Sequence, residues 1–295
     1  MPCYSPVTGR RTPDGRVVFS GLEGYTDRPV TVACGRCVGC RAKRARDWAV
    51  RIVHEAKMHE RNAFLTLTYD DEHLPNGESL SLRDWQLFAK RCYKRFGTFR
   101  YFHCGEYGEK LGRPHDHCIV FGEDFSSDRY PWTMRNGYPV WRSPTLEKLW
   151  PNGQSEIGSV TLESAAYVAG YVHKKVYGAK AEDHYTRVDP YTGECFSIRP
   201  EYTTMSRRPG IGRGWLDAFQ EDVFPADFVV HEGKKVGTPR YYSDQLGDRD
   251  PEAREELRRE RIRKATQWKE SYERLKVREK VAEAKMMFAE EIRTR

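Results

Sequence analysis

Three short runs of β-branched and aromatic residues predict strands in the first half of the chain. They lie at residues 64–69, 99–104 and 115–121, and each has the length and composition of a strand. Between the first two runs, Ser81-Leu-Arg-Asp84 is a capping box that predicts the start of a helix. Helical spacing gives this helix one apolar face, made of Leu82, Trp85, Phe88, Ala89 and Cys92. Strands packed against such a helix indicate an α+β domain.

The hydrophobic pattern elsewhere is less regular. Apolar positions at helical spacing predict two further helices, at residues 41–61 and 162–177. Residues 122–158 mix Trp with Pro and Gly and are expected to be irregular, and residues 178–250 are expected to be rich in loops. Acidic residues precede basic ones by four positions in the tail, which favours one long charged helix over residues 251–295. A solvated helix is its simplest role, and a partner-binding helix is the alternative.

Composition excludes several classes of protein. The 295 residues include 7 Trp, 17 Tyr and 13 Phe, too many for a disordered chain. No apolar run approaches the roughly 20 residues of a membrane span, and the first residues do not have the pattern of a secretory signal. We therefore expect an intracellular protein whose eight cysteines are thiols or metal ligands. The absence of a G-x-x-x-x-G-K-[ST] phosphate loop argues against an ATP-driven motor.

Basic side chains gather locally within a net charge of +7. Residues 36–46 contain five Lys and Arg and no acidic residue. Arg207, Arg208 and Arg213 lie among glycines, a composition typical of a flexible loop that can approach a phosphate backbone. Such patches favour a polyanionic ligand, although an exposed basic loop without a fixed partner is nearly as common.

A candidate metal site lies on the predicted strand 115–121. His115 and His117 alternate along it, so their imidazoles project from one face about 7 Å apart. A third ligand should come from the neighbouring strand, and Glu106, at the end of that strand or in the turn after it, is the candidate. Two imidazoles and a carboxylate suit Mg²⁺ or Mn²⁺ acting as a Lewis acid. Taken alone, a histidine pair of this kind more often lies on a solvated strand.

Candidate nucleophiles lie on the predicted helix 162–177. Tyr167 and Tyr171 are four residues apart, and Lys174 and Lys175 follow on the same side of the helix. A phenol becomes a good nucleophile when an ammonium group or a metal ion stabilises its anion. An amphipathic helix with boundary tyrosines would explain this pattern alone. Combined with the histidine pair, it indicates attack of a tyrosine on a phosphodiester.

Six motifs follow one another along the chain. They are Cys34-Gly-Arg-Cys-Val-Gly-Cys-Arg41, Phe64-Leu-Thr-Leu-Thr-Tyr69, Gly105-Glu-Tyr-Gly108, Arg113-Pro-His-Asp-His117, Tyr167-x-x-x-Tyr171-x-x-Lys174-Lys175 and Ser206-Arg-Arg-Pro-Gly-Ile-Gly212. As an ordered set they resemble the HUH endonucleases, and in particular the replication initiation proteins of small single-stranded DNA phages, the microviruses of the gokushovirus type. The resemblance covers roughly residues 1–215.

This resemblance implies a rolling-circle initiator. Such a protein nicks single-stranded origin DNA through a 5′-phosphotyrosine intermediate, and later rejoins the strand into a circle. It would have a central antiparallel sheet of about five strands, ferredoxin- or RRM-like, with flanking helices. A host helicase and DNA polymerase would be its partners in the cytoplasm of a bacterial cell, with no membrane involved.

The resemblance also assigns roles to residues. His115 and His117 match the metal-binding pair, Glu106 the third ligand, and Tyr167 and Tyr171 the paired nucleophiles. Lys174 or Lys175 matches the accompanying lysine. The family usually has a hydrophobic residue between the two histidines, and here Asp116 stands there. Either this strand end is exposed to solvent or Asp116 takes part in the site.

The cysteine-rich segment predicts a second metal site. Cys34, Cys37 and Cys40 can converge on one ion, and tetrahedral zinc requires a fourth ligand. The resemblance supplies Cys3 as that ligand. An iron–sulfur cluster is the alternative, but nothing else in the chain indicates redox chemistry. A structural zinc would present the neighbouring basic helix to DNA, and the expected DNA contacts are Arg41, Arg44, Arg51, Arg207, Arg208 and Arg213.

The chain is thus expected to divide into four segments. These are a zinc-binding segment (1–45), a catalytic domain (46–215), a loop-rich linker (216–250) and a charged helix (251–295). A relaxase or transposase would share the same chemistry, and a non-enzymatic zinc-containing DNA-binding protein is a further alternative. A histidine-triad hydrolase would need a histidine where Ile119 stands, and a two-histidine phosphoesterase would need a pair of H-x-[ST] motifs.

Overall fold

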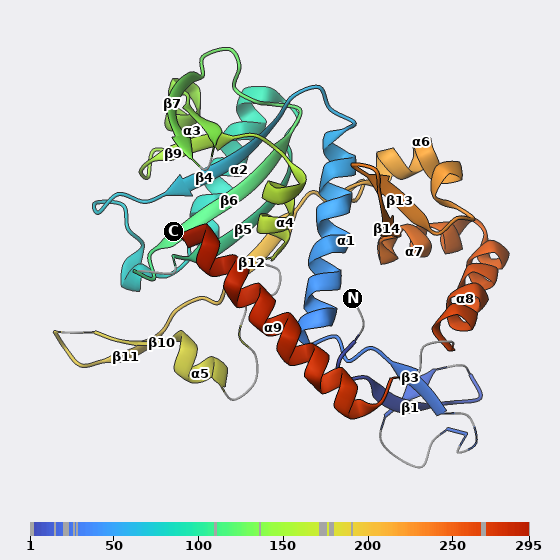
Figure 1. Ribbon diagram of the computed structural model, residues 1–295. Helices are drawn as coiled ribbons and strands as arrows, with labels where there is room; N and C mark the ends of the chain where they lie inside the picture. Colours follow the sequence, from blue (N-terminus) through green and yellow to red (C-terminus); the bar gives the residue numbers. More distant parts are fainter. Residues whose placement is uncertain are drawn as a thin grey trace. The chain divides into compact units, whose positions relative to one another are not determined.

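The computed structural model describes residues 3–14, 16–19, 24–25, 27, 29–108, 111–135, 137–170, 176, 180–189, 191–266 and 270–294 (Figure 1). The chain forms two compact units. The sheet unit is Ala45–Gln245, and the terminal unit combines Met1–Arg44 with Leu246–Arg295.

A seven-stranded antiparallel sheet forms the centre of the sheet unit, in the order β12-β5-β6-β4-β9-β8-β7. Its strands are β4 (Asn62–Thr68), β5 (Arg100–Tyr107), β6 (Pro114–Phe121), β7 (Tyr130–Arg135), β8 (Tyr138–Arg142), β9 (Ser155–Gly158) and β12 (Tyr202–Met205). The three predicted strands are confirmed, and the sheet is two strands wider than the expected five. The stretch 122–158, expected to be irregular, supplies β7, β8, β9 and the short helix α3 (Pro144–Leu149).

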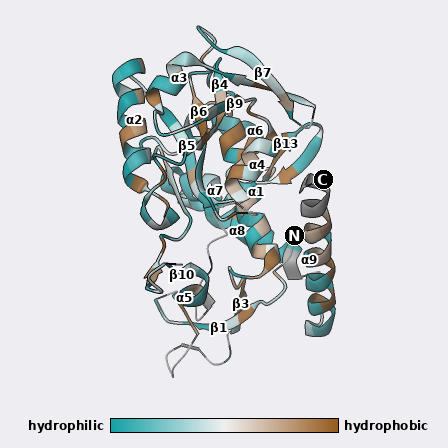
Figure 2. Ribbon diagram, turned by 90° about the vertical axis from the view of Figure 1, so that its left-hand side faces the viewer, coloured by the Kyte–Doolittle hydropathy of each residue, from teal (hydrophilic) through white to brown (hydrophobic). Residues whose placement is uncertain are grey.

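Helices cover both faces of this sheet. On one face, α2 (Leu82–Phe96) buries Trp85, Phe88, Ala89 and Cys92 against the sheet. The predicted capping box begins it, because the backbone N–H of Asp84 donates to Ser81 Oγ at 3.2 Å. Figure 2 shows hydrophobic and hydrophilic residues alternating along α2 beside β5 and β6.

The other face packs against residues of α1 (Val38–Ala56) and α4 (Leu162–Gly170). The apolar contacts come from Ala49 and Ile52 of α1 and from Ala165, Val168 and Ala169 of α4. Strand alternation explains the two cores, since neighbouring residues of β6 point to opposite faces. This second face carries the candidate site.

The second half of the sheet unit is more ordered than expected. Residues 178–250 contain α5 (Lys180–Tyr185), β10 (Thr186–Val188), β11 (Cys195–Ser197), β12, α6 (Arg213–Val223), β13 (Phe228–His231), β14 (Lys234–Gly237) and α7 (Arg240–Arg249). The prediction of a loop-rich linker at 216–250 is therefore wrong. Its helices and hairpin share a core of Val50, Leu216, Val223, Val229 and Tyr242. The strands of this region have only three or four residues each, and non-helical backbone at Phe219 interrupts α6, which weakens the periods in the sequence.

The terminal unit contains a small sheet, β2-β1-β3, and the charged tail. Its strands are β1 (Val7–Arg11), β2 (Val17–Val18) and β3 (Pro29–Val32). The tail is helical as predicted, but it forms α8 (Pro251–Thr266) and α9 (Tyr272–Thr294) instead of one helix. Ser271 ends the interruption, because its hydroxyl accepts the backbone N–H of Arg274 at 3.3 Å. Within the described ranges, no helix combines the length and hydropathy of a membrane span.

Candidate metal and tyrosine site

Three predicted ligands converge where β5 and β6 pair. The register places Glu106 directly opposite His115. Glu106 Oε1 lies 2.7 Å from His115 Nε2 and 3.0 Å from His117 Nε2. One ligand atom from each of the three residues lies within 4.8 Å of the others. The structure therefore brings Glu106, His115 and His117 together as a set that could hold one metal ion.

The Nδ1 atoms of His115 and His117, which point away from Glu106, each lie within hydrogen-bond distance of an oxygen atom. His115 Nδ1 is 3.2 Å from the carbonyl oxygen of Arg113, which can only accept, so Nδ1 carries the proton that it donates. His117 Nδ1 is 3.1 Å from Thr66 Oγ1, directly opposite on β4. Phe64 stacks on the His117 ring with centroids 5.4 Å apart. These contacts orient both Nε2 atoms toward Glu106, where a metal ion would take the place of the protons that the imidazoles donate to the carboxylate.

Burial and hydrogen bonding set the charges of the cluster. Burial raises the pKa of Glu106, but hydrogen bonds from His115 and His117 outweigh it and hold the pKa below its ordinary value. Burial lowers the pKa of His117 below its ordinary value. Burial also lowers the pKa of His115, but the hydrogen bond and charge of Glu106 outweigh it and leave the pKa raised. An ionised carboxylate facing two imidazole nitrogens is donor chemistry that fits Mg²⁺ or Mn²⁺.

Tyr167 reaches this cluster from α4. The helix begins with a reciprocal cap, since Ser164 N donates to Thr161 Oγ1 at 3.1 Å and Thr161 N donates to Ser164 Oγ at 2.8 Å. The Tyr167 hydroxyl lies 3.4 Å from both Glu106 Oε1 and His117 Nε2. Tyr167 is 39% exposed, so a large substrate can reach its oxygen. Three other predicted residues, Tyr171, Lys174 and Lys175, lie outside the described residues.

Asp116 faces the opposite side of the sheet from the two histidines. It is 1% exposed, and its Oδ1 lies 2.8 Å from His103 Nε2. His103 Nδ1 is 3.0 Å from Thr204 Oγ1, and its ring stacks on Trp85 at 3.5 Å. Both expectations for Asp116 are therefore wrong, because it is neither exposed to solvent nor part of the ligand cluster. This pair was not predicted, because it depends on the register of β5 with β6.

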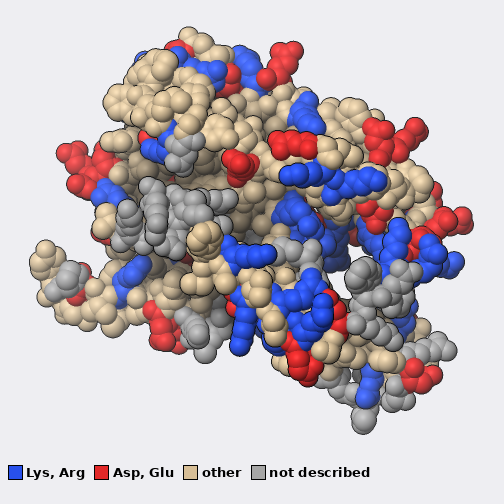
Figure 3. Space-filling model, viewed as in Figure 1, with Lys and Arg blue, Asp and Glu red and all other residues tan. Residues whose placement is uncertain are grey.

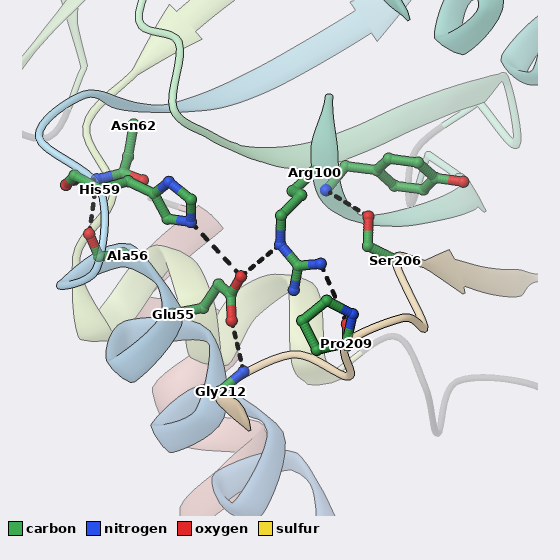
Figure 4. Close-up of polar contacts among 9 residues, drawn as sticks. Glu55, Ala56, His59, Asn62, Arg100, Ser206, Pro209 and Gly212 are labelled. Carbon is green, nitrogen blue, oxygen red and sulfur yellow. Dashed lines mark hydrogen bonds and ion pairs between the residues drawn. The ribbon is translucent and has the colours of Figure 1, made fainter. Parts of the chain in front are cut away.

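The loop that carries Arg207 and Arg208 is firmly anchored, in contrast to the flexible loop expected (Figure 4). The Glu55 carboxylate accepts the Arg100 Nε–H at 2.6 Å and the Gly212 N–H at 2.7 Å. Arg100 Nη1 donates to the carbonyl of Pro209 at 3.1 Å. Arg207 and Arg208 are nevertheless exposed on this fixed loop.

The other predicted DNA-binding arginines have different surroundings. Arg51 is 9% exposed; its guanidinium lies 4.0 Å from the Trp48 ring and 3.8 Å from the Tyr241 ring. Its Nε donates to the carbonyl of Ile211 at 3.0 Å, so Arg51 holds the loop instead of presenting a surface charge. Arg213 is ion-paired with Asp217 at 2.8 Å. The exposed pair on α1 consists of Arg41 and Arg44.

The four cysteines predicted to bind zinc meet in the terminal unit. The Sγ atoms of Cys3, Cys34, Cys37 and Cys40 all lie within 4.8 Å of one another. Cys3 Sγ is 3.6 Å from Cys34 Sγ and 3.9 Å from Cys37 Sγ. A zinc ion with Zn–S bonds of about 2.3 Å separates tetrahedral sulfurs by about 3.8 Å. The spacing therefore fits a metal centre and is too long for a disulfide.

Backbone N–H groups point at these sulfurs. Tyr4 N lies 3.3 Å from Cys37 Sγ, and Cys34 N lies 3.2 Å from Cys3 Sγ. Burial raises the pKa of the Cys37 thiol, but hydrogen bonds from the backbone of Tyr4 and Cys40 outweigh it and lower the pKa to about 7. Such donors stabilise the thiolates that a metal ion requires.

The fold and the site together define an α+β protein with a candidate metal-and-tyrosine site, made of Glu106, His115, His117 and Tyr167, on one face of an antiparallel sheet. Residues 62–176 match the family model of the replication-associated protein ORF2/G2P. The replication-associated protein VP4 of Bdellovibrio phage phiMH2K is 33% identical over 263 residues, which cover 85% of this chain and 79% of the relative. The replication-associated protein ORF2 of Spiroplasma virus 4 is 30% identical, over 73% of this chain and 68% of the relative.

The chain belongs to this family of phage replication-associated proteins. A further relative, the replication-associated protein ORF4 of Chlamydia phage 1, is 32% identical over 76% of this chain and 56% of its own length. No solved structure matches the chain.

Proposed function

We propose that this protein initiates rolling-circle replication by nicking single-stranded origin DNA with a tyrosine. The observation that carries the proposal is the Tyr167 hydroxyl 3.4 Å from both Glu106 Oε1 and His117 Nε2. The names of the relatives support a role as a replication initiator. The matched family region, residues 62–176, contains every residue of the metal-and-tyrosine site.

A divalent cation held by Glu106, His115 and His117 would supply Lewis-acid polarisation of the scissile phosphate. Tyr167 forms a new P–O bond to the phosphorus, and the bond from phosphorus to the 3′-oxygen breaks. The phenol gives up its proton and the departing 3′-oxygen takes one up, so the products are a 5′-phosphotyrosine and a 3′-hydroxyl. Because one phosphodiester replaces another, rejoining needs no ATP.

Two further groups complete the proposed reaction. Lys174 or Lys175 provides the ammonium group that stabilises the phenolate. Tyr171 cuts the regenerated origin after one round and releases a new 3′-hydroxyl at the end of the displaced strand. This hydroxyl attacks the first phosphotyrosine, which frees the Tyr167 phenol and closes the displaced strand into a circle. A host polymerase would extend the 3′-hydroxyl and a host helicase would open the duplex, in the cytoplasm of the bacterial host.

We also propose that the four-cysteine centre holds a structural zinc ion and that five arginines bind the DNA backbone. The proposed contacts are the exposed Arg41, Arg44, Arg207 and Arg208, together with Arg213, which is half-buried and paired with Asp217. Metal analysis of Cys37→Ser tests the zinc centre, with Cys195→Ser as the control because Cys195 is exposed and lies outside the cluster. Loss of zinc is expected only in the first variant, and unchanged zinc in Cys37→Ser would refute the site.

A denaturing gel tests the nicking reaction. The protein would be incubated with Mn²⁺ and end-labelled single-stranded fragments that tile its own genome. A labelled band at protein size is expected, absent without the cation and lost in His117→Ala. Tyr167→Phe and Tyr171→Phe should each weaken it, whereas Tyr93→Phe, on the opposite face of the sheet, should not. If DNA is bound but no covalent adduct forms with any fragment, the proposal fails and a non-enzymatic DNA-binding protein replaces it.

A further inference from the structure

The hairpin of β7 and β8 presents aromatic side chains to solvent at one edge of the large sheet. Residues 129–142 include four aromatic residues and three arginines but no Asp or Glu. Trp132 is 55% exposed, Tyr138 50% and Tyr130 41%. Figure 3 shows a largely uncharged surface at the upper left, where this hairpin lies. Three exposed aromatic side chains on one hairpin indicate a binding surface.

The hairpin shares its face of the sheet with the metal-and-tyrosine site. Arg135 on β7 forms a bidentate pair with Glu156 on β9, at 2.8 and 3.1 Å. Glu156 lies directly opposite Thr66, the residue that contacts His117. The Tyr138 hydroxyl lies 3.4 Å from Glu163 on α4, the helix that carries Tyr167. A strand of DNA crossing from the site to the edge of the sheet would therefore meet the hairpin.

The backbone of β7 is poorly suited to pairing with a strand of another protein. Pro131 has no N–H to donate, and a bulge interrupts the register between Pro131 and Thr133. Trp132 lies within this bulge, with the Arg142 guanidinium 4.9 Å from its ring centroid. Arg142 Nε is buried and has no hydrogen-bond partner among the described residues. Exposed rings beside arginines match the bases and phosphates of a single strand better than an added β-strand.

We propose that Trp132, Tyr130 and Tyr138 form a stacking platform for single-stranded DNA that leads to or from Tyr167. This inference extends the proposed function by adding a subsite for the substrate. Every nucleotide has a planar base, so stacking on these rings would tolerate any sequence. The platform would hold the strand while the nicking site selects the phosphate.

Charge plays the smaller part at this subsite. Arg135 is already paired with Glu156, and Arg142 Nη2 lies 3.0 Å from Glu147. Binding that depends on stacking releases few counterions, so its loss should leave the salt dependence of affinity nearly unchanged. Loss of Arg207 and Arg208, which are exposed, should instead reduce that salt dependence.

Fluorescence anisotropy with labelled oligothymidylate tests the platform in the full-length protein without added divalent cation, so that no cleavage is needed. Trp132→Ala should weaken binding about tenfold, with an unchanged salt slope, and Trp132→Phe should restore most of it. Tyr93→Ala is the control, because Tyr93 is 46% exposed on α2, which covers the opposite face. Duplex DNA of equal length should bind Trp132→Ala and the wild type equally.

Unchanged oligothymidylate affinity in both Trp132→Ala and Tyr130→Ala would overturn the platform, even if nicking proceeds. A shift of the wild type to a dimer that Trp132→Ala abolishes, measured by light scattering, would assign the rings to a protein interface instead. The assay does not depend on nicking. Weakened binding with no covalent adduct in the gel would therefore refute the proposed reaction and leave the DNA subsite standing.

Discussion

Two clusters of carboxylate and imidazole groups lie on opposite faces of the same two strands. On one face, Glu106 of β5 meets His115 and His117 of β6, within reach of the exposed Tyr167. On the other face, Asp116 of β6 meets His103 of β5, closed in by α2. Both clusters combine a carboxylate and imidazole groups from β5 and β6, but the surroundings of the two clusters differ.

Convergence and access separate the two clusters. His103 is fully buried, and its ring nitrogens contact two different residues, Asp116 and Thr204, instead of converging with a second imidazole on one carboxylate. Burial lowers the pKa of His103, and its hydrogen bond to Asp116 only partly offsets this. At Glu106 two imidazole nitrogens point at one carboxylate, an arrangement that a cation between them would stabilise. The same chemistry therefore indicates a metal centre on one face and a structural contact on the other.

The largest expected effect comes from the isosteric change Glu106→Gln. It removes one charged ligand, so nicking should fall by at least about a thousandfold, because a Lewis acid contributes several kcal/mol to such a transition state. Circular dichroism should show an intact fold, and calorimetric titration should show weaker Mn²⁺ binding. Undiminished nicking by Glu106→Gln would remove the carboxylate from the proposed metal site.

Substitutions at Asp116, on the opposite face, should lower the stability of the protein instead of its nicking activity. Asp116→Ala leaves buried His103 without its partner, so the free energy of unfolding should fall by about 3 kcal/mol in urea titrations. Asp116→Asn, which can still accept the His103 N–H, should cost less. Mn²⁺ affinity of the folded protein should change little in either variant. A variant that folds normally but no longer binds Mn²⁺ would show that the two faces are one functional unit.

The sequence predicts the face with Glu106, His115 and His117 more readily than the face with Asp116 and His103. Alternation along 115–121 was enough to place His115 and His117 on one face, and the capping box was enough to locate α2. The contacts of Asp116 with His103 and of His117 with Thr66 depend on the registers of β6 with β5 and β4. A register depends on how two strands pair, so the alternation within one strand does not reveal it.

The same limit explains the misreading of residues 216–250. Its buried residues are spread over short elements separated by turns, so no helical or strand period persists long enough to be read. β12 likewise joins the sheet from about a hundred residues beyond β5, pairing Thr203 with Cys104. Alternation within one strand predicts that His115 and His117 share a face. Adding Glu106 to them also required the expectation that the preceding strand is their neighbour in the sheet.

A third buried histidine, His54, sharpens the comparison because its hydrogen-bond partner is a hydroxyl group instead of a carboxylate. Its Nδ1 lies 3.0 Å from the Tyr242 hydroxyl, its ring stacks on Trp215, and burial lowers its pKa to about 3. The unfolded chain binds a proton at about pH 6.5 and the folded chain does not, so stability falls as the pH falls below 6.5. At pH 5 this contribution should reach about 2 kcal/mol.

The measurement is urea unfolding of His54→Phe and wild type between pH 7.5 and 5. The variant should lose about 2 kcal/mol less than the wild type over this range, whatever its stability at neutral pH. The other histidines are common to both proteins, so their contributions cancel in the difference. If the free energies of unfolding of the two proteins changed in parallel with pH, His54 would bind its proton equally in the folded and unfolded chains. That result would contradict the lowered pKa.

The smallest effect is expected from Thr66→Val, which touches the metal site only through His117. The Thr66 hydroxyl holds His117 Nδ1 at 3.1 Å, and valine keeps the shape of the side chain without the oxygen. Looser orientation of the imidazole should weaken Mn²⁺ binding about tenfold, while unfolding changes by about 1 kcal/mol. Thr68→Val is the matched control, two residues further along β4, where the hydroxyl lies 3.3 Å from the carbonyl of Gln154 instead. Equal Mn²⁺ affinities in the two variants would mean that strand geometry alone orients His117. In that case the face with His117 would differ from the face with His103 only in its access to solvent and substrate.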